Sequence, residues 1–361
     1  MKYDLTKNIE EAGRELVSRP VKATTAELLL IQYELRNKYR DRPQPERYGL
    51  YLDEILEKVS VPLEKYDLIA GRSIHRLLDD EEEKIFSTYN KEATLRIDRT
   101  MLDNGHIIYS WEDVVALGLC GLKKRAEDTL AKAENEDSRI FLKGALLVYG
   151  AIEKYLLRYS EKAKELGMAE LSEVCRKAAT EVPNDFRTAL QLLYTVTFVQ
   201  CSYITKNPTV TVGRLDNILY PLYKRGIEDG SLTNGEVSAL ITDFYCKHNL
   251  NMGRGEHQVG GENATTFNRI YNFDAPQYLM LAGTDENGNS AVNELTELFA
   301  EAIEPKFKKS RHCRPLLQGY GQGAPQALAY PLPKGFKQCF DDVLQRHRHH
   351  KRLYENGTSR K

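Results

Sequence analysis

The chain has 361 residues and a net charge of −1, from 51 basic and 52 acidic side chains. Hydrophobic residues make up 41% of the composition and charged residues 29%, which is typical of a globular protein and excludes collagen, long disorder and a dedicated nucleic-acid binder. No apolar run approaches the roughly 20 residues of a membrane span, and the charged start does not fit a signal peptide. The six cysteines occur without a C-x-x-C pair, which indicates reduced thiols. We therefore expect a soluble cytoplasmic protein that binds neither nucleic acid nor a membrane.

The first half of the chain shows helical patterning. The capping-box sequence Thr24-Thr-Ala-Glu27 predicts a helix that ends before Pro43. Ser110-Trp-Glu-Asp113 predicts the start of another helix, with a break near Gly118–Gly121. Apolar residues at helical spacing then predict a long helix over residues 140–166.

Two later helices are predicted from their N-terminal caps. Asn184 or Asp185 caps a helix that passes through Val196. Thr233-Asn-Gly-Glu236 caps another that runs to about Asn249.

Short apolar segments predict two strands. Residues 209–212 are β-branched and end at Gly213, which indicates a buried strand. Residues 277–283 predict a second strand, which ends in a turn over 285–288 and is followed by a helix over 290–303. Together these elements predict an α/β protein in which helices predominate.

The composition changes near the C-terminal end of the sequence. Residues 1–310 contain 41 basic and 49 acidic side chains, whereas Arg311–Lys361 contains 10 basic and 3 acidic side chains and four of the eight histidines. This segment also has clustered prolines and no long amphipathic period. We expect residues 309–361 to be a poorly ordered tail that does not continue the preceding fold.

The most unusual local motif is Gly213-Arg214-Leu-Asp216, which leaves a predicted strand. Its local pattern favours a strand–helix corner in which the arginine and the aspartate satisfy buried backbone groups. A lone histidine such as His106, which follows a glycine in a turn, is more often a hydrogen-bonding residue than a catalyst. No P-loop, hydrolase triad or metal motif is present. Local motifs therefore predict no metal site and assign no activity.

Six stretches form an ordered set, although each is weak alone. They are Leu68-Ile-Ala-Gly71-Arg72, Gly105-His106 with Ala116-Leu-Gly-Leu, Phe186-Arg-Thr-Ala-Leu-Gln-Leu-Leu193, Gly213-Arg-Leu-Asp-Asn-Ile-Leu-Tyr-Pro221, Leu281-Ala-Gly-Thr-Asp-Glu-Asn-Gly288 and Ala291-Val-Asn-Glu-Leu295. In order and spacing, this set resembles the pyruvate formate-lyase domain of glycyl radical enzymes, from about residue 10 to about Lys308.

The resemblance implies a ten-stranded α/β barrel inside a jacket of helices, of which residues 1–308 would be the mostly helical, incomplete N-terminal part. It also implies a lyase, dehydratase or formate acetyltransferase-like activity of anaerobic metabolism, which breaks C–C, C–N or C–O bonds in small molecules. No cofactor is expected to be bound directly. In this family a separate iron–sulfur activating enzyme installs the radical with S-adenosylmethionine, and the full-length enzymes are often homodimers.

The resemblance further implies two radical-carrying residues, a cysteine in a Gly-Cys-x-Glu loop and a glycine in an Arg-Val-x-Gly-Tyr loop. Neither motif occurs in this sequence. We therefore predict no catalytic residue in this chain, and we interpret Cys201 and Cys246 as core thiols on helices.

The resemblance also suggests which residues face substrate. Dehydratase-like members carry a His-Ser pair shortly before Gly-Arg-x-Asp, and this chain has Pro208-Thr209 there. The missing histidine leaves a diol-dehydratase specificity unsupported. We expect His106, Asn207 and Thr209 to bind substrate, and Gly213, Arg214 and Asp216 to form a structural motif.

The resemblance stops at Lys308, where family members continue with a sequence like Asn-Pro-x-x-x-Val-Arg-Tyr. Removing one A from a permitted codon set for Lys309–Pro315 gives Asn-Pro-Val-Ile-Val-Val-Arg, and the same shifted frame permits family-like residues through Asp342. We therefore predict a one-base insertion in an A-run around Lys308–Lys309, and hence an N-terminal enzyme fragment without activity of its own.

Two alternatives remain open at this point. The chain is then either a non-catalytic helical subunit that partners a radical enzyme, or an unrelated scaffold with a nucleic-acid-binding tail. The second predicts basic residues interleaved with aromatics or gathered on one helix face, and the tail shows neither clearly.

Overall fold

The computed structural model describes residues 3–18, 25–93, 107–204, 210–251 and 277–307. The helices are α1 Thr6–Ser18, α2 Ala26–Leu35, α3 Gln44–Lys58, α4 Asp80–Ala93, α6 Trp111–Leu130, α7 Glu136–Glu165, α8 Ala169–Thr180, α9 Phe186–Val199, α10 Leu215–Ile218, α11 Tyr220–Glu228, α12 Asn234–Asn251 and α14 Glu294–Phe307, with the π-helical turn η1 Gln200–Ile204. The strands are β1 Ile107–Ile108, β2 Val210–Gly213 and β3 Gln277–Leu279. The predicted tail, residues 309–361, lies outside the described residues.

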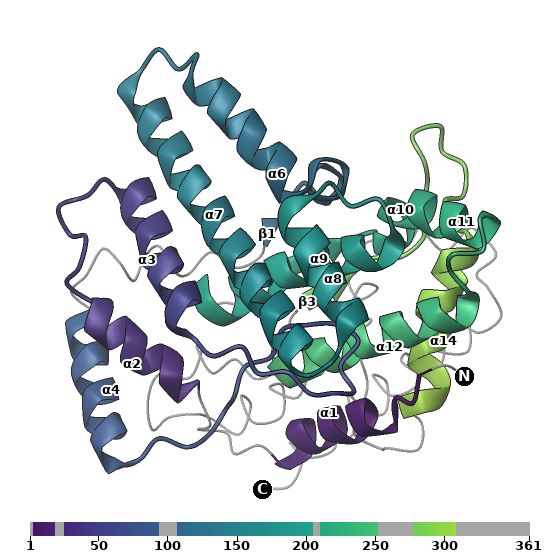
Figure 1. Cartoon of the computed structure of the whole chain (residues 1–361), viewed down its shortest axis with the longest axis horizontal. Helices are drawn as coiled ribbons and strands as arrows, with labels where there is room; N and C mark the ends of the chain where they lie inside the picture. Colours follow the sequence, from purple (N-terminus) through teal and green to yellow (C-terminus); the bar gives the residue numbers. More distant parts are fainter. Residues whose placement is uncertain (1–2, 19–24, 94–106, 205–209, 252–276, 308–361) are drawn as a thin grey trace, which may run out of the picture.

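The three strands form a parallel sheet in the order β1-β2-β3. Ile107 pairs with Val210, and Val210 pairs with Gln277, so the three strands begin level with one another. Val210 and Val212 are buried beneath the surrounding helices, as expected for a parallel sheet that is covered on its faces. The described part of the chain is therefore a mostly helical α/β structure with a small central sheet (Figure 1).

Helices α6 and α7 form a hairpin that projects from the body of the molecule, with α3 beside α7 (Figure 1). The contact between α3 and α7 is close because Gly144 has no side chain: an added Cβ would collide with the carbonyl oxygen of Pro45. Helix α6 bends at Gly118, whose backbone is non-helical, which confirms the predicted break.

Several predicted caps form as the sequence indicates. The Asp185 side chain accepts the N–H of Thr188 at 2.8 Å and begins α9. Thr233 and Glu236 make the reciprocal bonds of a capping box at the start of α12. Helix α2 begins at Ala26, but Thr24, the predicted cap, lies outside the described residues. The Glu27 carboxylate accepts the N–H and hydroxyl of Ser60.

A buried ion cluster ties α1, α12 and the loop before α4 together. Asp67 accepts Arg72 Nη2 at 2.6 Å and pairs with Lys247 Nζ at 2.6 Å, and both Asp67 and Lys247 have fully buried side chains. Burial raises the pKa of the Asp67 carboxyl, but the cations of Lys247 and Arg72 outweigh burial and hold that pKa below its ordinary value. Glu11 of α1 completes the cluster through two bonds from Arg72.

Asp243 of α12 binds the same loop through neutral groups. Its carboxylate accepts the amide of Asn8 at 2.6 Å and the N–H groups of Leu68 and Ile69 at 2.9 Å. The Leu68–Arg72 stretch is therefore anchored on both sides, and its place in the ordered motif set has a structural reason. Among the described residues no helix is long and apolar enough to cross a membrane.

Candidate functional site

The candidate site is built around β2, the central strand of the sheet. Gly213 ends β2 with a φ of 72°, and a Cβ there would lie 2.9 Å from Cδ1 of the buried Trp111. Trp111 also donates its indole N–H to the Thr211 carbonyl oxygen at 2.8 Å. A residue without a side chain is therefore required where β2 turns toward α10.

Arg214 and Asp216 join this turn to the segment that follows β3. The Arg214 guanidinium donates to the carbonyl oxygens of Ala282 at 3.3 Å and Thr284 at 2.8 Å. The fully buried Asp216 carboxylate accepts the N–H of Ala282 at 2.7 Å and the hydroxyl of Thr296 at 2.6 Å. These contacts hold β2, β3 and α14 as one corner.

The electrostatics of this corner fit a structural role. Burial raises the pKa of the Asp216 carboxyl, and hydrogen bonds from Thr296, Ala282 and Asn217 oppose that rise only in part. Among the described residues, the carboxylate accepts hydrogen bonds from Asn217, Ala282 and Thr296, and these donors are all neutral groups. The carboxylate oxygens are used within the corner, which suits positioning of the strands better than proton transfer.

The three residues expected to bind substrate, His106, Asn207 and Thr209, lie outside the described residues. The structure does describe the strand ends that follow two of them in the sequence. Ile107 directly follows His106, Val210 directly follows Thr209, and Ile107 and Val210 are paired in register. The amino ends of β1 and β2 therefore lie side by side.

Three of the four described cysteines are buried. Cys201 is 3% exposed on η1 and Cys246 is fully buried on α12, in agreement with their interpretation as core residues. Cys175 is fully buried on α8, and burial raises the pKa of its thiol to about 12. A thiol with this pKa stays protonated and unreactive at neutral pH. Within the described segments, no three metal-ligating side chains gather into a group.

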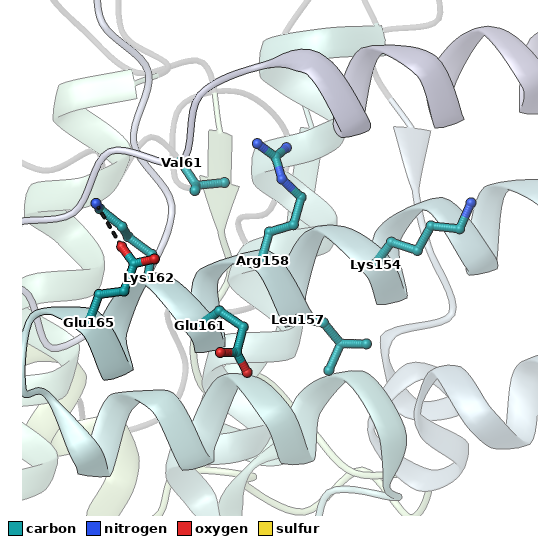
Figure 2. A pocket seen from close by; sticks show the side chains of 7 residues that line it. All are labelled: Val61, Lys154, Leu157, Arg158, Glu161, Lys162 and Glu165. Carbon is teal, nitrogen blue, oxygen red and sulfur yellow. Dashed lines mark hydrogen bonds and ion pairs between the residues drawn. The ribbon is translucent and has the colours of Figure 1, made fainter.

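A hollow beside α7 gathers Lys154, Arg158 and Lys162 (Figure 2). Each of these cations already has a partner. Lys154 pairs with Asp53 at 2.8 Å, Arg158 donates to the carbonyl oxygens at the end of α3, and Lys162 pairs with Glu165 at 3.1 Å. Arg158 therefore caps the end of α3. Because the two lysines are paired with carboxylates, none of the three cations in the hollow is left to bind an anion.

Sequence reasoning missed two pairs of interacting side chains. The pair of Asp67 and Lys247 was not predicted, because 180 residues separate them in the chain. The contact of Tyr109 with Gln200, 2.6 Å between the hydroxyl and Oε1, was also missed. The only signal for the first pair was the Leu68–Arg72 motif, and the second pair had no local signal.

Comparison with known proteins identifies relatives of one kind. The sequence model of the pyruvate formate lyase-like family matches residues 79–308. A (2S)-3-sulfopropanediol dehydratase of Klebsiella oxytoca is 27% identical over 64% of this chain and 29% of its own length. The glycyl radical subunit of 4-hydroxyphenylacetate decarboxylase of Clostridioides difficile is 26% identical over 71% of this chain and 30% of its own length.

The fold agrees with these relatives. A glycyl radical enzyme from Archaeoglobus fulgidus superimposes with a TM-score of 0.64 at 20% identity, covering 85% of this chain and 47% of that structure. The chain thus has the fold of part of a glycyl radical enzyme, and it spans about 30% of the length of the two curated relatives.

Proposed function

Because this chain belongs to the pyruvate formate lyase-like family, we propose that it forms the substrate-facing N-terminal part of a glycyl radical lyase or dehydratase. The observation that carries the proposal is the level start of the parallel strands, with Ile107, Val210 and Gln277 in register. This register aligns the strand ends from which His106 and Thr209 depart.

In this proposal, His106, Asn207 and Thr209 bind a small polar substrate. An imidazole, a carboxamide and a hydroxyl can each hydrogen-bond a hydroxyl or carboxylate group of such a molecule. Arg214 and Asp216 act as positioning residues, because they hold the far end of β2 against the segment after β3. A displaced β2 would also move Thr209, because Thr209 is covalently joined to Val210, the first residue of the strand.

The bond-breaking chemistry requires residues that are not in these 361 positions. Neither the Gly-Cys-x-Glu nor the Arg-Val-x-Gly-Tyr motif occurs. We propose that both are encoded in the frame that resumes family-like sequence after Lys308, and that an activating enzyme installs the radical there. The complete enzyme would be a cytoplasmic homodimer that breaks C–C, C–N or C–O bonds.

Electron paramagnetic resonance tests this proposal. The 361-residue chain, incubated without oxygen with a family activating enzyme and S-adenosylmethionine, is expected to give no glycyl doublet. A protein expressed after removal of one A at the codons of Lys308 and Lys309 is expected to give the doublet. A doublet from the unaltered chain would contradict the proposal.

Steady-state kinetics of the frame-restored enzyme then test the residue roles. His106→Ala and Thr209→Ala are expected to raise KM for substrate, whereas His75→Ala, a change near α4, is the matched control. A second candidate, a non-catalytic helical subunit, predicts instead that the frame-restored protein gives no radical.

A further inference from the structure

A second cavity lies between α3, α6, α7 and the end of α9. Its volume is about 550 Å³. Volumes of a few hundred to about 1,000 Å³ are typical of sites for small molecules. The cavity is therefore large enough for a ligand of one or two rings.

The walls of this cavity are apolar and fixed in place. Leu119 and Leu122 of α6 and Ile152 of α7 are each less than 10% exposed and line it together with Val199 of α9. The close approach of α3 to α7 at Gly144 holds the wall that carries Tyr48. An apolar molecule placed here would be stabilised by the burial of its surface.

Polar groups meet at one side of this apolar space. Gln200, only 4% exposed, accepts the Tyr109 hydroxyl at 2.6 Å. Tyr48 lines the same cavity, and its hydroxyl donates to no group in the part of the chain that the structure describes, so it is open to an incoming acceptor atom.

The charge state of the cavity restricts the ligand. Burial raises the pKa of both Tyr48 and Tyr109, and their proximity adds to the rise for Tyr109, so both hydroxyls stay protonated at neutral pH. Arg125, at the rim, already pairs with Asp113 at 3.0 Å. With its charges paired and its phenols neutral, the cavity favours an uncharged ligand.

We propose that this cavity binds an uncharged, largely apolar small molecule whose hydroxyl or carbonyl oxygen accepts a hydrogen bond from Tyr48. The lone pairs of the Tyr109 oxygen can in turn accept a ligand hydroxyl. This ligand differs in kind from the small polar substrate proposed above. Its binding would give the chain a second function that does not depend on radical chemistry.

The test uses 2-naphthol and naphthalene, which differ by one hydroxyl, as probes of the full chain. Equilibrium dialysis over a range of probe concentrations measures the binding of each probe directly. Titrations are expected to show 2-naphthol binding about tenfold more tightly than naphthalene, the effect of one good hydrogen bond.

Two variants separate the hydrogen bond from the apolar space. Tyr48→Phe is expected to lower 2-naphthol affinity toward that of naphthalene and to leave naphthalene binding unchanged. Ala145→Leu, which fills the cavity from α7, is expected to abolish binding of both probes. Leu77→Ala, at an exposed apolar side chain elsewhere, is the control and should change neither. Circular dichroism checks that each variant keeps its fold.

Three results would overturn the proposal. The first is equal affinity for the two probes in the unaltered chain. The second is unchanged 2-naphthol affinity in Tyr48→Phe. The third is an affinity that falls as protein concentration rises, with dimerisation seen by sedimentation, because a second copy of the chain would then occupy the cavity.

Discussion

Asp67 and Asp216 are both buried carboxylates, but their surroundings differ in charge. Asp67 lies between the cations of Arg72 and Lys247, and their attraction leaves its pKa below the ordinary value. Asp216 is bonded by the hydroxyl of Thr296 and by amide groups, and burial leaves its pKa above the ordinary value. The first joins the loop before α4 to α12, and the second joins strands to α14.

The difference shows how two parts of one fold use a buried carboxylate. In the ion cluster, each charge compensates the others, so that loss of one member leaves a buried cation without compensation. At the corner, loss of the charge removes hydrogen bonds but leaves no opposite charge behind. The same substitution in the two places should therefore have different consequences.

The largest expected effect is that of Asp67→Asn. The change leaves Lys247, whose side chain is fully buried, and Arg72 without their main anion, and we expect a loss of about 3–5 kcal/mol in the free energy of unfolding. Urea unfolding followed by circular dichroism measures it. Asp113→Asn, which breaks the exposed pair with Arg125, is the control and should cost far less. Similar losses of unfolding free energy in the two variants would mean that burial does not determine how much the Asp67 pair contributes to stability.

Asp216→Asn should have a smaller effect. The asparagine oxygen can replace one acceptor, but its NH₂ group faces the donors of Ala282 or Thr296, and we expect a loss of about 1–3 kcal/mol. The same urea experiment gives the value. A loss as large as that of Asp67→Asn would contradict the distinction between the two sites.

Gly213→Ala tests whether the corner also depends on close packing. Its φ of 72° costs an alanine about 1–2 kcal/mol, and its Cβ would lie 2.9 Å from Trp111, so a rearrangement of the indole adds to that cost. Gly230→Ala is a matched control, with a φ of 74° and open space around the added Cβ. The difference between the two variants isolates the contact with Trp111, and equal losses would show that this contact is unimportant.

The smallest expected effect is the pH dependence. Because the folded pKa of Asp67 is lowered, its stabilisation is present above the unfolded pKa of about 4 and is lost as the pH falls through the folded pKa. Because the folded pKa of Asp216 is raised, the contribution of Asp216 to stability is present below about pH 4 and is lost as the pH rises through the folded pKa. Urea unfolding at a series of pH values should give opposite slopes for the difference between the wild type and each asparagine variant. Slopes of the same sign would be incompatible with the two environments.

Helix caps and bends that depend on neighbouring residues could be predicted from the sequence. The cap at Asp185, the capping box at Thr233 and the bend at Gly118 are all determined within a few positions and were confirmed. The second strand is shorter than predicted and ends at Leu279, because Ala282 and Gly283 take positive φ values at the corner with Asp216.

Long-range partners were not predictable in this way. Lys247 and Glu27 each have a partner that lies far away in the chain, Asp67 and Ser60, and no local pattern indicates either. The expected substrate-binding residues, His106, Asn207 and Thr209, were named from an ordered set of motifs, and their roles stay predictions. The cavity with Tyr48 and Tyr109 combines residues from five separate elements, which no periodicity reveals.

The most direct test of the proposed function is the nucleotide sequence across the codons of Lys308 and Lys309 and the DNA that follows. We predict an additional A in a run of A at these codons, followed in the shifted frame by Gly-Cys-x-Glu and Arg-Val-x-Gly-Tyr. A gene with no such run, and with neither motif downstream in any frame, would contradict the assignment of this chain to the substrate side of a radical enzyme.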